Sequence, residues 1–154
     1  MAVSAPGRLG FPARVTKGKD GFYLVTFRDV PEAGTDDKDK ETAILDAVDA
    51  LTTALAGYVK ADTSLPRPSK LKPGEVLIHV EPSFAAKMAL RRLMAERKLS
   101  NVAFAKLLKL HEREVRRMTD PDYPTKLDRL DAALRALGHR VIVDIQPLSS
   151  KHAA

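Results

Sequence analysis

The chain has no cysteine and no tryptophan, and only 5% of its 154 residues are aromatic. Without cysteine it can form neither a disulfide bond nor a thiolate nucleophile, so we expect a reducing, cytoplasmic setting. No apolar run approaches the roughly 20 residues that a membrane-spanning helix needs. The N-terminal MAVSAPGRLG lacks the apolar centre of a secretion signal. Disulfide-stabilised, thiol-dependent and membrane-spanning classes are therefore not expected.

Patterns typical of catalysis are equally scarce. The chain has no nucleophile elbow and no phosphate-binding loop. Its histidines lack metal-ligand spacing: His79, His111, His139 and His152. A nuclease of the ribonuclease-H type needs several carboxylates converging on metal ions, but Asp29 follows a predicted strand and Asp46 and Asp49 lie on a predicted helix. The sequence therefore predicts a protein that is not an enzyme and needs neither a metal nor another cofactor.

The net charge of +6 is unevenly distributed. Residues 1–82 carry 11 Lys/Arg and 12 Asp/Glu, a net charge of −1, whereas residues 83–154 carry 15 and 8, a net charge of +7. Such asymmetry suggests that the C-terminal half meets a polyanion, and a solvated basic surface is an equal alternative.

The N-terminal half is typical of a small α+β domain, predicted over 10–82. Residues 11–16 and 22–27 alternate in polarity around the turn sequence KGKDG, which predicts a β-hairpin. Residues 29–38 indicate turns and allow a short third strand. A helix is predicted over about 39–60, and a strand over 74–82 follows a proline-rich loop. The expected inner stripe of that helix is Ile44, Val48, Leu51, Leu55 and Tyr58.

The C-terminal half, predicted as a second domain over 83–147, is mainly helical. Ser83 and Ser100 are expected to cap two helices, and Thr125 with Asp128 has the spacing of a capping box for a third. Gly138 is well placed to end that last helix.

Residues 139–147 then predict a β-strand with Val141, Val143 and Ile145 on one face. This strand either returns to the edge of its own domain or pairs with the same strand of a second copy. We favour the second alternative, which makes these three residues the predicted seam of a homodimer or higher homo-oligomer.

The stretch SNVAFAKLLKLHEREVRRMTD (100–120) can be one long helix or two helices with a break. In a single helix Leu108 and Leu110, two residues apart, would point to nearly opposite sides. A turn at 109–111 would let Leu110 fold inward. The second alternative resembles the helix-turn-helix of Cro-like phage repressors. Two departures are Lys109, where that motif usually has Gly, and His111, where it usually has Ser or Thr.

A helix-turn-helix would place the first turns of its second helix against base edges in the major groove. Residues at the starts of the neighbouring helices would contact phosphates. The candidate DNA-binding residues are therefore Asn101, Glu112, Arg113, Arg116, Arg117 and Lys126.

Three pieces of the sequence together resemble the HicB antitoxin family. They are FPARVTKGKDGFYLVTFRDVPEAGTDDKDKETAILDAVDALTTALAGYV, LPRPS (65–69) and YPTKLDRLDAALRALGHRVIVDI, and they span about residues 11–146. The resemblance implies a partial ribonuclease-H-like β-β-β-α-β domain followed by a helix-turn-helix domain that ends in a dimerising strand. It also implies an antitoxin that binds and neutralises a HicA-type ribonuclease toxin, an mRNA interferase, and represses its own operon.

The residues themselves agree in one respect with a basic toxin as partner. The segment 28–49 carries eight Asp/Glu and three Lys/Arg, and Asp36, Asp37 and Asp39 lie at its centre. Solvated loop carboxylates are the alternative. The alternative function is a stand-alone repressor whose N-terminal domain senses a ligand or only oligomerises.

Overall fold

The computed structural model of the protein describes residues 9–147. Within them the backbone forms two compact units: residues 9–81 with 144–147, and residues 82–143. The boundary lies at the start of a helix whose first residue is a proline, Pro82. Proline is favoured at the first position of a helix because the amide proton it lacks would have no partner there.

The N-terminal unit contains a four-stranded sheet in the order β3-β2-β1-β4, with antiparallel pairing throughout. The strands are β1 (Gly10–Lys17), β2 (Tyr23–Phe27), β3 (Thr35–Asp37) and β4 (Glu75–His79). The predicted hairpin is β1–β2, and Gly21 supplies its positive φ of 87°. The short third strand is β3, so the unit is α+β as predicted. Its assignment to a partial ribonuclease-H-like fold stays a prediction.

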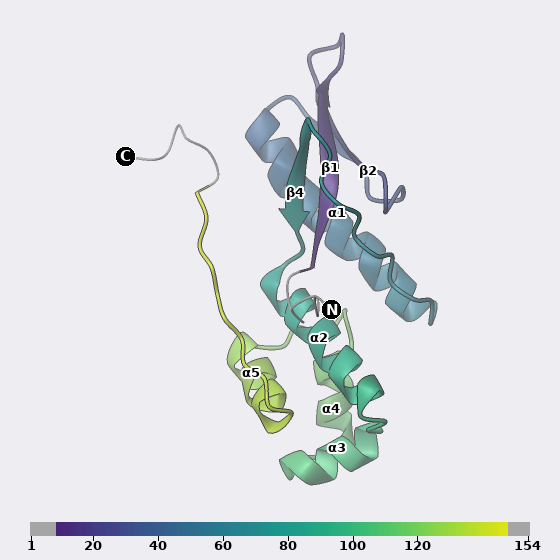
Figure 1. Cartoon of the computed structure of the whole chain (residues 1–154), viewed down its shortest axis with the longest axis vertical. Helices are drawn as coiled ribbons and strands as arrows, with labels where there is room; N and C mark the ends of the chain where they lie inside the picture. Colours follow the sequence, from purple (N-terminus) through teal and green to yellow (C-terminus); the bar gives the residue numbers. More distant parts are fainter. Residues whose placement is uncertain (1–8, 148–154) are drawn as a thin grey trace. The chain divides into compact units, whose positions relative to one another are not determined.

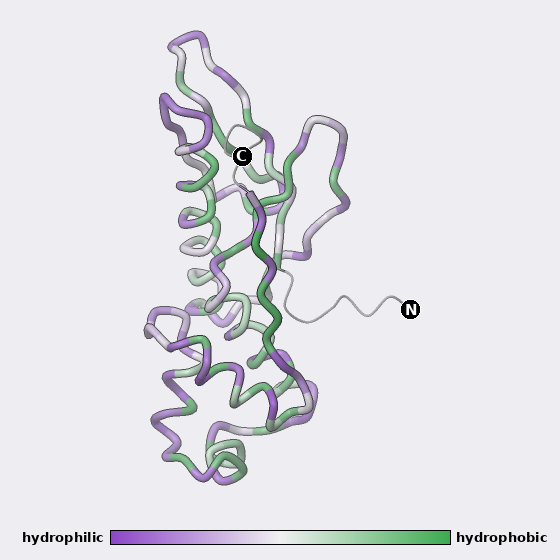
Figure 2. The backbone as a smooth tube through the Cα atoms, turned by 90° about the vertical axis from the view of Figure 1, so that its left-hand side faces the viewer, coloured by the Kyte–Doolittle hydropathy of each residue, from purple (hydrophilic) through white to green (hydrophobic). Residues whose placement is uncertain are grey.

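One helix, α1 (Lys40–Lys60), covers one face of this sheet (Figure 1). Asp39 begins it, because its carboxylate accepts a hydrogen bond from the Thr42 amide at 2.9 Å. Hydrophobic and hydrophilic residues alternate along the helix (Figure 2). The fully buried residues of the sheet and helix include Phe11, Val25, Ala43, Ala47, Leu51 and Leu55.

The predicted inner stripe of α1 needs a correction. Leu51 and Leu55 are buried, but Ile44 and Val48 are only half-buried because Ala43 and Ala47 occupy the centre of the interface. Small side chains there let the helix approach the strands closely. By length and composition alone α1 could cross a membrane, a test that the core helix of a soluble protein also passes. Its apolar side packs on the sheet.

The C-terminal unit contains α2 (Pro82–Glu96), α3 (Asn101–Leu108), α4 (Glu112–Thr119) and α5 (Leu127–Ala136). Its core is built from all four helices and includes Leu90, Phe104, Val115, Leu130 and Leu134. These helices correspond to the predicted ones.

Two of the predicted helix starts are wrong. Helix α2 begins one residue before Ser83, so Ser83 lies inside it. The capping box of Thr125 and Asp128 is not formed, because α5 begins only after Lys126. Ser100, by contrast, caps α3 through a 3.1 Å hydrogen bond from the Ala103 amide. Gly138 follows α5 with a φ of 78°, as its predicted role requires.

The stretch 100–120 is two helices with a break. Lys109 adopts a left-handed conformation (φ 58°, ψ 42°) and ends α3. The amides of Lys109 and Leu110 donate to the main-chain oxygens of Lys106 (3.2 Å) and Ala105 (2.9 Å), the two bonds of a Schellman motif. Leu110 is thereby packed, half-buried, against the core. A non-glycine residue in this conformation costs roughly 1–2 kcal/mol.

Residues 139–147 do not form the predicted strand within the single chain described here. Val141 packs partly on the helical core, and its amide donates to the Asp131 carboxylate at 2.7 Å. Val143 and Ile145 are 56% and 85% exposed. A strand needs a neighbour to complete its ladder, and among residues 9–147 this segment has none. Pairing with a second copy stays a prediction.

Candidate functional site

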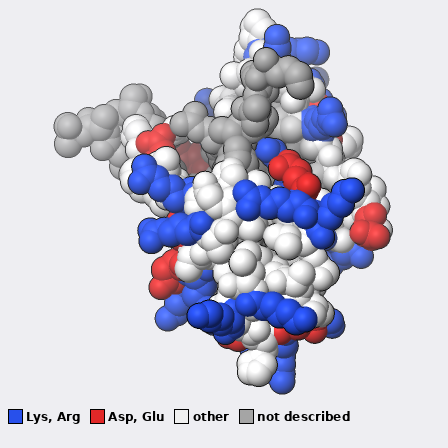
Figure 3. Space-filling model, turned by 60° about the horizontal axis from the view of Figure 1, so that its bottom comes forward, with Lys and Arg blue, Asp and Glu red and all other residues white. Residues whose placement is uncertain are grey.

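Four of the six predicted DNA-binding residues share one face of α4. Glu112, Arg113, Arg116 and Arg117 follow each other at positions i, i+1, i+4 and i+5 of the helix. Arg113 and Arg117 project to the side opposite the buried Val115, and Glu112 and Arg116 lie beside them, nearer the core. All three arginines are exposed. Lys and Arg side chains outnumber Asp and Glu on the face that brings the α3–α4 end forward (Figure 3). The arrangement is a cationic helix face presented to solvent.

Two of these arginines have defined neighbours. Arg116 forms an ion pair with Glu112, one turn earlier, at 2.5 Å. The guanidinium of Arg117 lies over the ring of Tyr123, 4.9 Å from its centre. Arg117 therefore has an uncharged neighbour, whereas Arg116 has a carboxylate neighbour. The stacking on Tyr123 was not predicted, since nothing in the sequence spacing relates position 117 to position 123.

The start of α4 is fixed by Glu114. Its carboxylate accepts a hydrogen bond from the His111 amide at 3.3 Å and pairs with Arg129 of α5 at 2.9 Å. The hydrogen bond from Arg129, with that from the His111 amide, holds the pKa of Glu114 below its ordinary value. Glu114 therefore links α4 to α5 and provides an acceptor for the His111 amide in the turn before α4.

The remaining two predicted DNA-binding residues lie at helix starts. Asn101 is the first residue of α3 and is half-buried, and Lys126 immediately precedes α5 and is exposed. Amide groups at a helix start attract anions, so both positions are compatible with phosphate contacts.

The sequence reasoning missed a buried lysine. Lys87 of α2 is only 3% exposed, and its ammonium donates hydrogen bonds to the main-chain oxygens of Asp120 (2.7 Å) and Tyr123. Burial lowers its pKa. Arg91, one turn later, donates to the main-chain oxygen of Thr119 at 3.3 Å. The sequence did indicate that Lys87 is buried, because it stands three residues before Leu90, on the inner side of α2.

The predicted toxin-binding carboxylates are neighbours at the junction of β3 and α1, but they differ in role. Asp36 is exposed on β3, which is an edge strand. Asp37 accepts a hydrogen bond from the Asp39 amide at 2.8 Å, and Asp39 is the cap of α1. Two of the three therefore shape the junction as well as carrying charge.

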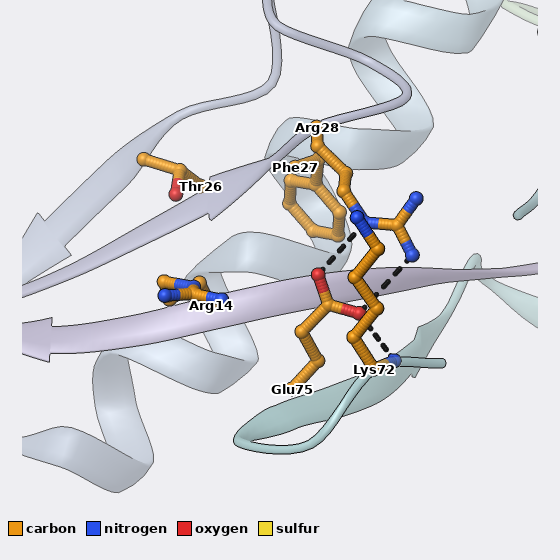
Figure 4. Close-up of a pocket in the computed structure, with 6 residues that line it drawn as sticks. All are labelled: Arg14, Thr26, Phe27, Arg28, Lys72 and Glu75. Atoms are coloured by element: carbon orange, nitrogen blue, oxygen red, sulfur yellow. Dashed lines mark hydrogen bonds and ion pairs between the residues drawn. The ribbon is translucent and has the colours of Figure 1, made fainter. Parts of the chain in front are cut away.

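A polar pocket opens on the N-terminal unit (Figure 4). At its centre Glu75 accepts hydrogen bonds from Arg28 Nε (2.8 Å), Arg28 Nη2 (3.2 Å) and the Lys72 amide (2.7 Å). The hydrogen bonds from Arg28 lower the pKa of Glu75 to about 2. An acid that is ionised at neutral pH cannot serve as a general acid there. The pocket is lined by Arg14, Thr26, Phe27, Arg28, Lys72 and Glu75.

The same corner anchors the proline-rich loop. Arg28 also donates to the main-chain oxygen of Lys70 at 2.6 Å, and the Asp29 carboxylate accepts from the Ser69 amide (2.8 Å) and hydroxyl (2.7 Å). Asp29 is thus engaged in fixing the loop. Within residues 9–147 no three His, Cys, Asp or Glu side chains are grouped so that they could hold a metal ion.

The chain is similar to known proteins over most of its length. Residues 10–89 match a family described as the HicB-like antitoxin of bacterial toxin–antitoxin systems. Antitoxin HicB 2 of Photorhabdus laumondii is 35% identical over 83% of this chain and 90% of its own length. Antitoxin HicB of Escherichia coli K12 is 30% identical over 83% of this chain and 93% of its own length.

The Arg28–Glu75 pair generates a prediction about pH. Since the pKa of Glu75 is about 2 in the folded chain and 4.5 ordinarily, its contribution to stability is complete above pH 4.5. That contribution is lost as the pH falls toward 2. Glu75→Gln should therefore lower the urea midpoint of the N-terminal unit at pH 7 and make its decline between pH 4.5 and 2 shallower.

A double-variant cycle supplies the control. Arg28→Met should lower the midpoint at pH 7 by a similar amount, and Arg28→Met/Glu75→Gln should lower it by less than the sum of the two. Additive effects would mean that the two side chains contribute independently, contrary to the pairing described.

Proposed function

The chain belongs to the HicB-like antitoxin family of bacterial toxin–antitoxin systems, and from this we propose a function for each of its two units. The N-terminal unit binds and neutralises a HicA-type ribonuclease toxin. The C-terminal unit binds operator DNA as a homodimer or higher homo-oligomer and represses transcription of the antitoxin's own operon. The family suggests a regulatory, non-enzymatic role, and we assign the protein to the cytoplasm. The observation that carries the proposal is the family match over residues 10–89.

The charge of the N-terminal unit supports the toxin partner. A protein that grips RNA needs a cationic face, and an acidic surface can cover it. Asp36 lies exposed beside the start of α1, where Asp37 and Asp39 add two more carboxylates. Asp37 accepts a hydrogen bond from the Asp39 amide, and Asp39 accepts from the amide and the hydroxyl of Thr42.

The geometry of α3 and α4 supports the DNA partner. Two eight-residue helices joined by a short turn, with Ala105 buried between them and Leu110 folded inward, are what a helix-turn-helix requires. The second helix presents Arg113, Arg116 and Arg117 to solvent. Arg pairs with guanine through two parallel hydrogen bonds, so these residues can read sequence as well as attract DNA.

The exposed apolar segment after α5 supports self-association. Val143 and Ile145 are largely exposed, and neighbouring Ile142 is 77% exposed. Apolar side chains in an unpaired extended segment are stabilised when two copies of the segment pair across a two-fold axis. Two DNA-reading helices related by such an axis can meet two half-sites one helical turn apart.

Substitution in α4 tests the DNA-binding proposal. Arg113→Ala should weaken binding to a selected operator by ~1–3 kcal/mol and relax base preference at one position. Lys126→Ala is the matched control, because a phosphate contact carries no sequence information. It should lower affinity evenly across sequences and flatten the salt dependence. If both variants bind like the parent protein in fluorescence anisotropy titrations, α4 is not the reading helix.

Truncation tests the proposed seam. A chain that ends before Arg140 lacks Val141, Val143 and Ile145, so it should be monomeric by light scattering. It should bind a two-half-site operator poorly and still hold the toxin. The exposed substitution Val102→Ala, on α3, serves as the control and should leave the oligomeric state unchanged. A truncated chain that remains dimeric would place the seam elsewhere.

Co-expression tests the toxin-binding proposal. Residues 1–82, of net charge −1, should restore growth to cells that express the neighbouring toxin gene, and residues 83–154 alone should not. Changing Asp36, Asp37 and Asp39 together to Asn should slow association with the toxin and reduce its salt sensitivity, because long-range attraction governs the encounter rate. Asn also caps helices, so α1 keeps its start. Growth arrest despite soluble residues 1–82 would mean that neutralisation needs the C-terminal unit.

A further inference from the structure

We propose that Tyr123 is a positioning residue for base readout: its ring holds the guanidinium of Arg117 in place, and the buried Lys87 holds the loop that carries Tyr123. The inference rests on the proposed DNA-binding function of α4. It goes further by assigning specificity to a residue outside the two helices that would meet DNA.

The first observation is the stacking itself. The guanidinium carbon of Arg117 lies 4.9 Å from the centre of the ring of Tyr123, a residue that is 39% exposed. A ring beneath one face of a guanidinium restricts its orientation and leaves the N–H groups along its edge free. Those N–H groups make the two parallel hydrogen bonds to guanine O6 and N7. Stacking therefore prepares Arg117 for that contact without competing for its donors.

Arg116, the other restrained arginine of α4, is held by a different kind of contact. Glu112 holds Arg116 through an ion pair at 2.5 Å, which occupies a donor and offsets the charge. A phenol ring does neither. Of these two restrained arginines, Arg117 is the one whose restraint uses neither an N–H donor nor an opposite charge.

The second observation is the anchoring of the loop between α4 and α5. Lys87 Nζ bonds to the main-chain oxygens of Asp120 and Tyr123, and the Tyr123 amide donates to the Asp120 oxygen at 3.3 Å. The prolines at the two ends of the sequence PDYP, Pro121 and Pro124, have a fixed φ. The backbone that carries the ring is therefore attached to a side chain of α2 that is only 3% exposed.

This anchoring gives Lys87 a reason to be buried. Its ammonium donates to two carbonyl groups, of Asp120 and Tyr123, that the end of α4 and the following turn leave without helical partners. A hydrophobic residue at position 87 would fill space but remove the two hydrogen bonds that attach the loop to α2. Lys87 thus fixes the loop, the loop fixes Tyr123, and Tyr123 fixes Arg117.

The experiment selects binding sites from randomised duplex DNA and measures affinities of the full chain and its variants for the selected site. Arg117→Ala should lose discrimination at one base pair by about tenfold, the lower part of the range for a lost bidentate contact. Tyr123→Leu should lose most of the same discrimination at the same base pair. Tyr123→Phe, which keeps the ring, should behave like the parent protein.

Double variants separate positioning from other roles. Arg117→Ala/Tyr123→Leu should lose little more than Arg117→Ala, because the ring acts through Arg117. Arg113→Ala/Tyr123→Leu is the matched control, and its losses should multiply. Tyr123 is exposed, so thermal unfolding of Tyr123→Leu should stay close to that of the parent.

The failures are distinguishable. If the parent chain selects no sequence, the proposed DNA-binding function fails and this inference fails with it. If the parent selects a site but Arg117→Ala and Tyr123→Leu affect different base pairs, or their losses multiply, only the positioning role is overturned. A Tyr123→Phe variant as defective as Tyr123→Leu would also overturn it, because the hydroxyl rather than the stacked ring would then matter.

Discussion

Lys109 holds the left-handed backbone conformation that ends α3 (φ 58°, ψ 42°), and the arrangement of the helical unit follows from it. The reversal lets Leu110 return to the core beside Ala105 rather than project among the surface charges. It also starts a new helix at Glu112, whose axis is independent of α3. Without the reversal, residues 100–120 would be one helix, and Arg113 and Arg117 would continue the surface of α3. The left-handed conformation of a non-glycine residue costs roughly 1–2 kcal/mol of conformational free energy, and the break between the two helices depends on it.

The four-stranded sheet depends on a different constraint, which is the closeness of α1. Ala43 and Ala47 stand where larger residues would push the helix away, so Leu51 and Leu55 reach the strands. Periodicity alone pointed to Ile44 and Val48, because they are larger and more hydrophobic. Periodicity identifies the apolar side of a helix well. It does not choose between adjacent stripes on that side, because the choice depends on the volume that the facing sheet leaves free.

Elements and boundaries with local causes were predictable from the sequence. The hairpin, the helix that begins at Asp39, the cap at Ser100, the break near Lys109 and the end at Gly138 each depend on residues a few positions apart. The start of α5 was not predictable, because Thr125 makes contacts with the main-chain oxygens of Arg117 and Tyr123 instead of capping. The candidate site shows the same division. The arginines of α4 could be identified from spacing, and the position of Lys87 on the inner side of α2 indicated its burial. The contacts of Tyr123 with Arg117 and of Arg129 with Glu114 depend on tertiary structure.

The charge of α4 indicates which part of the helical unit would attract phosphates and which part would read bases. Helix α4 has three arginines and two glutamates, a net charge of only +1, so the other residues of 83–154 supply +6 of the total +7. Attraction to phosphates scales with the number of cations that displace counterions, so in the proposed complex most of it would come from outside α4. The glutamates of α4 are engaged in fixing Arg116 and the helix start. In the proposed complex such a helix would contribute little to affinity for arbitrary DNA, and a wrong base opposite a fixed arginine would leave its donors unpaired. The surrounding lysines and arginines would therefore supply most of the non-specific affinity for DNA. The restrained side chains of α4 would supply the sequence specificity.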